Sequence, residues 1–157
     1  MARKNYFPAD HQAPPPLAAT AVRKVRFEEV DTMQVVWHGR YPSYFEDART
    51  AFGDTYGLSY AAFVRHRVMA PIAQMHIDYR LPLRLGDNLE IEARLHWNEA
   101  MRLDFSYSLL NGDRQVCATG YTVQLLTDID GSVVFIPPPW IKRFREKWQQ
   151  GGFTDES

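Results

Sequence analysis

The feature that most constrains the fold is a run of apolar side chains at helical spacing between residues 39 and 56. Its members are Tyr41, Tyr44, Phe45, Ala48, Ala51, Phe52 and Tyr56. Because residues three and four apart share one face of an α-helix, the spacing predicts a helix with one apolar face. Pro42 suits its first turn, and Gly57 suits its C-terminal end. Such an aromatic face must be buried, and a sheet wrapped around the helix would bury it.

The remainder of the chain is dominated by alternating apolar and polar residues, which is typical of strands. The ranges expected as strands are 20–28, 73–81, 89–97, 101–109, 115–126 and a short piece at 133–136. Asn111-Gly112-Asp113 is a hairpin signal. Ser59 can cap a short second helix, and Pro137-Pro138-Pro139 leads into a last helix over 140–149. One central helix followed by an antiparallel meander predicts an α+β fold with a sheet of five to six strands.

Two regions differ in composition. Residues 1–19 contain Pro8 and the run Pro14-Pro15-Pro16, which excludes helix interior and central strand. We expect an extended arm there, and a loose tail is favoured over an arm laid on a neighbour. Residues 20–157 are expected to form a single domain with a C-terminal helix.

Composition excludes several classes of protein. The 157 residues carry a formal charge of −1, which gives no support to nucleic acid as a partner. Cys117 is the one cysteine, so no internal disulfide or cysteine-based metal site is expected. No apolar run is long enough to span a membrane, and the first residues lack the apolar core of a signal peptide. The expectation is a cytoplasmic protein.

A carboxylate precedes the predicted helix. Asp31 follows the first strand, and the residues His38, Gly39 and Arg40 come directly before Tyr41. The backbone N–H groups of these three residues should be free at a helix N-terminus, which favours oxyanions. A carboxylate beside such donors fits an acyl-transfer site.

The stretch D-T-M-Q-V-V-W-H-G-R-Y-P-S-Y-F-E-D-A-R, residues 31–49, resembles the signature of hotdog-fold acyl-CoA thioesterases of the 4-hydroxybenzoyl-CoA thioesterase and YbgC-like type. The similarity extends over residues 20–145 in element order. It implies a hotdog fold, in which a sheet wraps a long helix, and hydrolysis of an acyl-CoA thioester to an acid and CoA. It also implies a homodimer or homotetramer with sites at a subunit interface. No metal or redox cofactor is implied; CoA enters as part of the substrate.

The resemblance assigns roles to single residues. Asp31 sits at the position of the catalytic aspartate, as nucleophile or as general base for water, and His38 matches the histidine of YbgC-like members. The alternative is that Asp31 has no catalytic role and is an ordinary turn residue. Two departures stand out. Gln34 occupies a position where the family usually has glycine, and only Arg102 is basic in a stretch that elsewhere grips phosphate.

Other residues are candidates for contact with the substrate. Val36, Trp37 and Tyr41 flank the proposed site, and CoA phosphates could be bound by Arg80, Arg84, Lys142 and Arg143. Glu46 and Asp47 are read as exposed helix charges, with Arg49 able to pair with Glu46. The residues His66, His76 and His96 do not form ligand pairs at metal-binding spacing.

Three alternatives concern function. A hotdog hydratase or dehydratase would pair a histidine with a carboxylate at a β-hydroxyacyl chain, although the spacing of Asp31 and His38 is not their usual motif. A non-catalytic acyl-binding hotdog module is favoured slightly by Gln34. The substrate could also be carried by acyl-carrier protein instead of CoA. The sequence does not define the acyl group.

Overall fold

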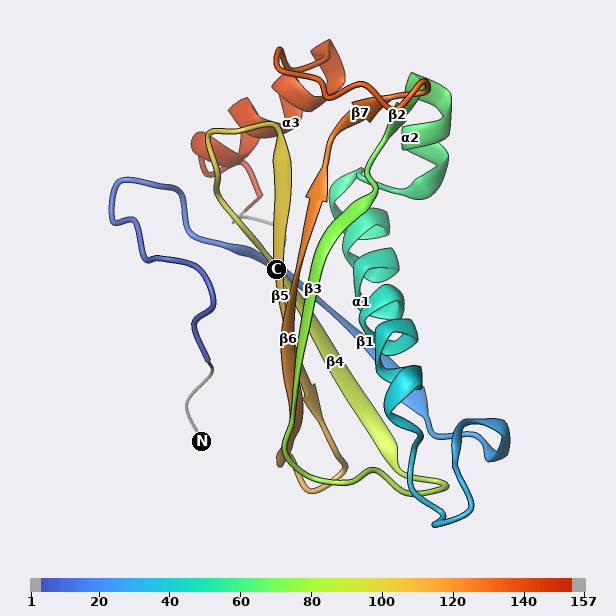
Figure 1. Cartoon of the computed structure of the whole chain (residues 1–157). Helices are drawn as coiled ribbons and strands as arrows, with labels where there is room; N and C mark the ends of the chain where they lie inside the picture. Colours follow the sequence, from blue (N-terminus) through green and yellow to red (C-terminus); the bar gives the residue numbers. More distant parts are fainter. Residues whose placement is uncertain (1–3, 154–157) are drawn as a thin grey trace.

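The computed structural model describes residues 4–153. Its elements, in chain order, are β1 (Leu17–Lys24), α1 (Tyr41–Tyr56), α2 (Tyr60–His66), β2 (Val68–Met69), β3 (Ile72–Tyr79), β4 (Asn88–His96), β5 (Arg102–Leu110), β6 (Val116–Leu125), β7 (Thr127–Asp128) and α3 (Pro139–Gln149). The five longer strands form one antiparallel sheet in the order β1-β4-β5-β6-β3, while β2 and β7 form a separate pair. Helix α1 lies across one face of the large sheet (Figure 1). The predicted hotdog arrangement is confirmed.

The apolar face of α1 packs on the sheet as its spacing predicts. Phe45 stacks on Tyr107 of β5 with ring centroids 4.4 Å apart, and Phe52 meets Phe105 edge to face at 5.0 Å. A side chain at Gly120 of β6 would come within 2.8 Å of the Phe45 ring. Glycine at this position therefore lets the helix lie close to the sheet.

The ends of the helices also follow the sequence signals. Gly57 ends α1 with a positive φ of 83°, and its N–H donates to the carbonyl of Gly53 at 2.9 Å. The Ser59 hydroxyl accepts from the amide of Ala62 at 3.2 Å and caps α2. Within the described residues, no helix is both long and apolar enough to cross a membrane.

The first strand and the arm before it differ from expectation. Strand β1 begins at Leu17 and ends at Lys24, so the range predicted for it ran past its end into a short 3₁₀ turn, Phe27–Glu29. Residues 4–16 lie over the face of the sheet opposite α1 (Figure 1). The Tyr6 hydroxyl donates to Asp78 at 2.6 Å, and the Trp148 indole donates to the carbonyl of Pro15 at 2.8 Å. The arm is thus docked on its own chain, because Tyr6 finds a partner on β3 and Pro15 finds one on α3, contrary to the expected loose tail.

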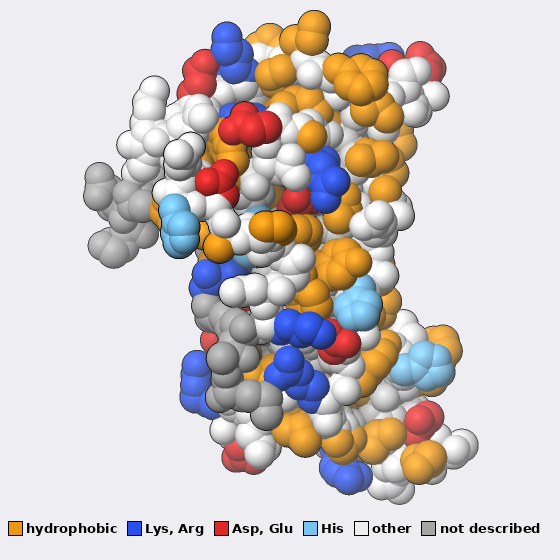
Figure 2. Space-filling view, turned by 60° about the vertical axis from the view of Figure 1, so that its left-hand side comes forward, with side chains coloured by type: hydrophobic (Ala, Val, Ile, Leu, Met, Phe, Trp, Pro, Cys, Tyr) orange, Lys and Arg blue, Asp and Glu red, His pale blue; other side chains and the backbone are white. Residues whose placement is uncertain are grey.

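Strand β3 forms one edge of the sheet and is largely exposed along its length. Its apolar side chains Ile72, Met75 and Tyr79 are 42%, 38% and 50% exposed. Figure 2 shows hydrophobic side chains along the right-hand side of the molecule in that view. An uncovered apolar edge of this kind is a surface on which another strand can pair.

Candidate active site

The loop that carries Asp31 is a tight hairpin between β1 and α1. Val30 and Val36 form an antiparallel bridge, and the Asp31 amide donates to the carbonyl of Val35 at 2.9 Å. One oxygen of the Asp31 carboxylate accepts from the amide of Met33 at 2.8 Å. Gln34 closes the turn in the left-handed region, with φ 63°. Gln34 therefore adopts a backbone conformation that favours glycine, so the turn retains a shape suited to glycine despite the substitution.

The backbone at the start of α1 presents free donors. A 3₁₀ turn, His38–Arg40, leads into the helix, and Pro42 lies in its first turn. Within residues 4–153, the amides of His38 and Gly39 donate to no other backbone group. The Arg40 amide, in contrast, donates to the carbonyl of Trp37 at 2.9 Å. Of the three amides expected to be free, the Arg40 amide is therefore used by the 3₁₀ turn.

Trp37 and His38 are both exposed beside this helix start. Their ring centroids are 5.1 Å apart. A side chain at Gly39 would meet the Trp37 ring at 2.3 Å, so glycine is required where the indole lies over the backbone. The hydroxyl of Tyr79 donates to the carbonyl of His38 at 2.7 Å. This bond fixes the C-terminal end of β3 to the loop.

Asp31 and His38 lie on the same loop but are not in contact. The Asp31 amide is bonded to the carbonyl of Val35, three residues before His38. No hydrogen bond joins the two side chains within the described chain.

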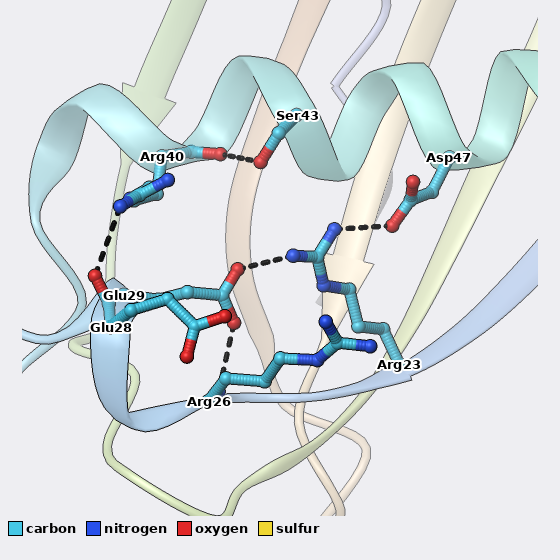
Figure 3. Close-up of polar contacts among 7 residues, drawn as sticks. All are labelled: Arg23, Arg26, Glu28, Glu29, Arg40, Ser43 and Asp47. Carbon is cyan, nitrogen blue, oxygen red and sulfur yellow. Dashed lines mark hydrogen bonds and ion pairs between the residues drawn. The ribbon is translucent and has the colours of Figure 1, made fainter.

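Below this loop lies a buried ionic cluster that the sequence did not reveal (Figure 3). Glu29 is 1% exposed; it accepts from the Arg23 guanidinium and from the amide of Arg26, the latter at 2.8 Å. Arg23 also pairs with Asp47 of α1 at 2.6 Å. Burial acts to lower the pKa of Arg23, but Asp47 and Glu29 outweigh it and the net shift is upward. The carbonyl of Glu29 in turn accepts from the Trp37 amide at 2.9 Å, so the cluster holds both sides of the loop.

Two predictions about charged residues of α1 are therefore corrected. Asp47 is not a free surface charge, because it is paired with Arg23 across the gap to β1. Glu46 does not pair with Arg49 among the described residues; it accepts from the Tyr60 hydroxyl at 3.1 Å. Arg49 instead donates to the hydroxyl of Tyr107 at 2.9 Å. Tertiary neighbours override the short-range helix pairing.

The predicted substrate contacts separate into two groups. Val36 and Tyr41 belong to the core, 5% and 3% exposed, and burial raises the pKa of Tyr41 to about 12. Their prediction as substrate contacts is corrected for this chain, because neither side chain faces solvent. Trp37 and Arg84 are exposed, and Arg84 forms a bridge with Val35 beside the Asp31 turn.

The other basic candidates lie elsewhere. Arg80 borders a groove on the sheet that also contains Glu90 and Arg114. Lys142 and Arg143 are on α3, at the opposite end of the molecule from the Asp31 loop (Figure 1). Of the four residues predicted to contact phosphate, Arg84 is thus the one that lies beside the Asp31 loop.

Three histidines away from the loop have structural partners. His66 stacks on Trp140 at 4.6 Å, His76 faces Asp78 at 3.1 Å, and His96 shares a hydrogen bond with Ser106 at 2.7 Å. Among residues 4–153, no three His, Cys, Asp or Glu side chains are grouped to hold a metal ion.

A cavity of about 700 Å³ lies at the other end of α1. Its lining is mostly apolar and includes Phe52, Leu58, Phe63, Val64, Met69 and Phe105. The polar exceptions include Arg49 and Gln124. At 1.5 Å per residue, Arg49 is about 12 Å along the helix from Tyr41, so the cavity is remote from Asp31 of the same chain. Sequence reasoning missed this cavity because its walls come from segments distant along the chain.

Comparison with known proteins gives a consistent family. A family model described as the thioesterase-like superfamily matches residues 25–144. Acyl-CoA thioester hydrolase YbgC of Escherichia coli O157:H7 is 30% identical over 90 residues, 57% of this chain and 67% of that protein. A 1,4-dihydroxy-2-naphthoyl-CoA hydrolase of Synechococcus elongatus is 32% identical over 107 residues, 66% of this chain and 76% of that protein.

The fold is shared with solved structures. The crystal structure of a DHNA-CoA thioesterase from Staphylococcus aureus superposes with a TM-score of 0.77 at 20% identity, covering 89% of this chain and 96% of that one. At this identity, the likeness establishes the fold alone.

Proposed function

We propose, from the premise that this chain belongs to the thioesterase-like superfamily, that it hydrolyses acyl-CoA thioesters with Asp31 and the amino end of α1. At the coarser level, the chain is a thioester hydrolase, in line with relatives named acyl-CoA thioester hydrolase and 1,4-dihydroxy-2-naphthoyl-CoA hydrolase. The observation that carries the finer proposal is the hairpin loop, which holds one carboxylate near two free helix-start amides.

The amides of His38 and Gly39 would bind the thioester oxygen as negative charge develops on it. Asp31 would either attack the carbonyl carbon or take a proton from an attacking water. The C–S bond then breaks, and the sulfur leaves as a thiolate that is protonated to give CoA. Overall, the thioester and one water yield a carboxylic acid and a thiol. The imidazole of His38 would orient water or protonate the thiolate.

The proposed active unit is a dimer formed through the edge of β3. The C-terminal end of β3 is bonded to His38, while Ala70 and Pro71, just before its N-terminal end, line the cavity. Antiparallel pairing about a two-fold axis sets the first end of one strand beside the last end of the other. Each Asp31 loop would then lie beside the cavity of the partner subunit. This arrangement overcomes the separation of loop and cavity within one chain.

CoA would approach over Trp37, with Arg84 as the basic side chain nearest the Asp31 turn. One observation favours a second candidate, a non-catalytic acyl-binding module. One Asp31 oxygen is already used by the Met33 amide, as in an ordinary turn. The other oxygen remains for chemistry, and the same substitution therefore tests both candidates.

The test is thiol release from short, long and aromatic acyl-CoAs by the wild type and by Asp31→Asn. We expect release by the wild type and a loss of about 100-fold or more in the variant, because the amide is neither a base nor a nucleophile. Asp113→Asn, in the exposed β5–β6 turn, is the matched control and should be as active as the wild type.

Equal rates for wild type and Asp31→Asn, with unchanged melting, would reduce Asp31 to a turn residue. If no acyl-CoA releases thiol, acyl-carrier-protein thioesters are the substrates to test next. Binding of these thioesters without hydrolysis would support the non-catalytic acyl-binding module.

A further inference from the structure

Arg49 is a positively charged residue in the wall of the cavity. Its Nη1 donates to the Tyr107 hydroxyl at 2.9 Å, and the guanidinium lies 5.8 Å from the centre of that ring. Tyr107 is itself bonded to Thr122 at 2.6 Å. Within residues 4–153, Arg49 forms no ion pair with a carboxylate. Its hydrogen-bond partners, the hydroxyls of Tyr107 and Tyr60, are both neutral and do not use all five of its N–H donors.

Among the described residues, the carboxylates nearest in sequence form no direct ion pair with Arg49. Glu46 accepts from Tyr60, and Asp47 is paired with Arg23. Asp54 lines the cavity but is an exposed residue, as is the second cavity arginine, Arg67. The cavity therefore has two arginines against one aspartate, and the partly buried one is Arg49.

The cation remains charged in this position. Burial acts to lower the pKa of Arg49, but the hydroxyls of Tyr107 and Tyr60 act in the other direction, and the net shift is upward. A guanidinium removed from water with only neutral hydroxyl partners is costly, so an anion that reaches it would be bound strongly. A planar carboxylate matches the fork of N–H donors.

We propose that this cavity takes an acyl group whose far end carries a carboxylate, and that Arg49 binds this carboxylate. The inference rests on the proposed thioesterase function, in which the cavity receives the acyl chain beside the catalytic loop of the partner subunit. The apolar lining holds the methylene chain, and a volume of about 700 Å³ is ample for a short dicarboxylic acyl group. The Ser59 hydroxyl, whose oxygen already accepts from Ala62, keeps its own proton to donate into the same cavity.

Gln124 could favour a different group at the far end of the acyl chain. Its side-chain oxygen is buried without a partner, while its nitrogen donates to the carbonyl of Ala70 at 2.7 Å. An unpaired acceptor favours a hydroxyl group over a carboxylate. The full charge on Arg49 outweighs this neutral acceptor, because charge-assisted bonds are about twice as strong as neutral ones.

The experiment compares three acyl-CoAs of equal chain length: hexanoyl-CoA, 6-hydroxyhexanoyl-CoA and adipoyl-CoA. The full-length wild type is expected to show a kcat/KM for adipoyl-CoA about 10- to 100-fold above that for hexanoyl-CoA, the range of a desolvated charged hydrogen bond. In Arg49→Met, this ratio should fall close to one. Arg65→Met, an exposed arginine of α2 outside the cavity, should retain the wild-type ratio.

The outcomes distinguish failure of the proposed thioesterase function from failure of the proposed role of Arg49. Inactivity of the wild type on all three substrates defeats the proposed function. Hydrolysis with no preference for adipoyl-CoA, or a preference for the hydroxyl compound, overturns only the role of Arg49. So does a fall in all rates of Arg49→Met by the same factor, since that indicates a structural role. Should Arg49→Met fail to fold, Gln124→Glu replaces it: a carboxylate placed in the cavity should lower the adipoyl preference, and an unchanged ratio overturns the proposal.

Discussion

At the residue scale, Gln34 shows that a residue other than glycine can occupy a left-handed turn position. The turn after Asp31 requires a left-handed residue, and Gln34 adopts φ 63° there. Its amide donates to the carbonyl of Asp31 at 2.9 Å, which fixes the turn. The cost of the substitution is therefore local strain, not a different loop.

Gln34→Gly should relieve this strain. A left-handed conformation costs a residue with a side chain about 1–2 kcal/mol, while glycine loses about 0.5–1 kcal/mol more backbone entropy on folding. We expect the free energy of unfolding to rise by about 0.5–1 kcal/mol, measured by urea denaturation. Gln34→Val is the matched control and should lower it, because a branched side chain tolerates this φ poorly. Equal stability of the two variants would contradict the strain.

At the scale of elements, the N-terminal arm and β3 are joined by one carboxylate. Asp78 accepts from Lys4 at 2.7 Å and from Tyr6 at 2.6 Å, and it faces His76 at 3.1 Å. The Tyr6 ring lies 5.3 Å from that of Tyr121. Hydrogen bonds from Lys4 and Tyr6 hold the pKa of Asp78 well below its usual range. Burial and the bond to Asp78 raise the pKa of Tyr6 to about 12.

The docked arm should depend on pH in a direction set by these shifts. The Asp78 contribution is fully present above the ordinary carboxyl pKa of about 4 and is lost as pH falls through the lowered value. The Tyr6 contribution is present below the ordinary phenol pKa of about 10 and is lost as pH rises toward 12. NMR contacts between the Tyr6 and Tyr121 rings should therefore persist from about pH 4 to 10 and be lost as the pH approaches about 12.

Asp78→Asn tests the cause of this dependence. Without the negative charge, the Tyr6 hydroxyl should ionise at a lower pH than in the wild type, and the ring contacts should be lost correspondingly earlier. Contacts that disappear near neutral pH in the wild type would show that the arm is held by other groups.

At the scale of the whole molecule, the unpaired edge of β3 and the separation of loop and cavity point to the same assembly. A β3-to-β3 pair would cover Ile72 and Met75 and would bring each Asp31 loop to the opposite cavity. Strand β1, the other edge, also has an exposed apolar residue, Val22 at 83%. It therefore provides an internal control for the effect of a new charge at a sheet edge.

Met75→Lys should weaken the dimer and its activity together, because two lysines would face each other near the two-fold axis. Sedimentation equilibrium is expected to show dissociation at concentrations about 100-fold above those of the wild type, with thiol release falling in parallel. Val22→Lys should behave as the wild type. A monomeric Met75→Lys protein with full activity would refute the shared site.

Periodicity predicted the elements well because it is a local property. The aromatic face of α1, the caps at Gly57 and Ser59, and the alternation in β4 all follow from spacing along a few turns or residues. The Asp31 loop could also be predicted from local sequence, since the carboxylate, the turn and the start of α1 fall within ten residues. The error at β1 arose where alternation continued past Lys24 into a 3₁₀ turn, which alternation alone does not distinguish.

By itself, the sequence determined which residues form the helix, the strands and the loop with its carboxylate. Tertiary structure alone decided which distant residues meet. Arg49 contacts Tyr107, 58 residues away, instead of Glu46 on its own helix. The arm met the sheet, and the cavity arose where α1, α2 and β5 converge, because strand order sets these neighbours. Periodicity records the face a residue occupies but not what lies opposite, so the cation and cavity behind the further inference could not be read from the sequence.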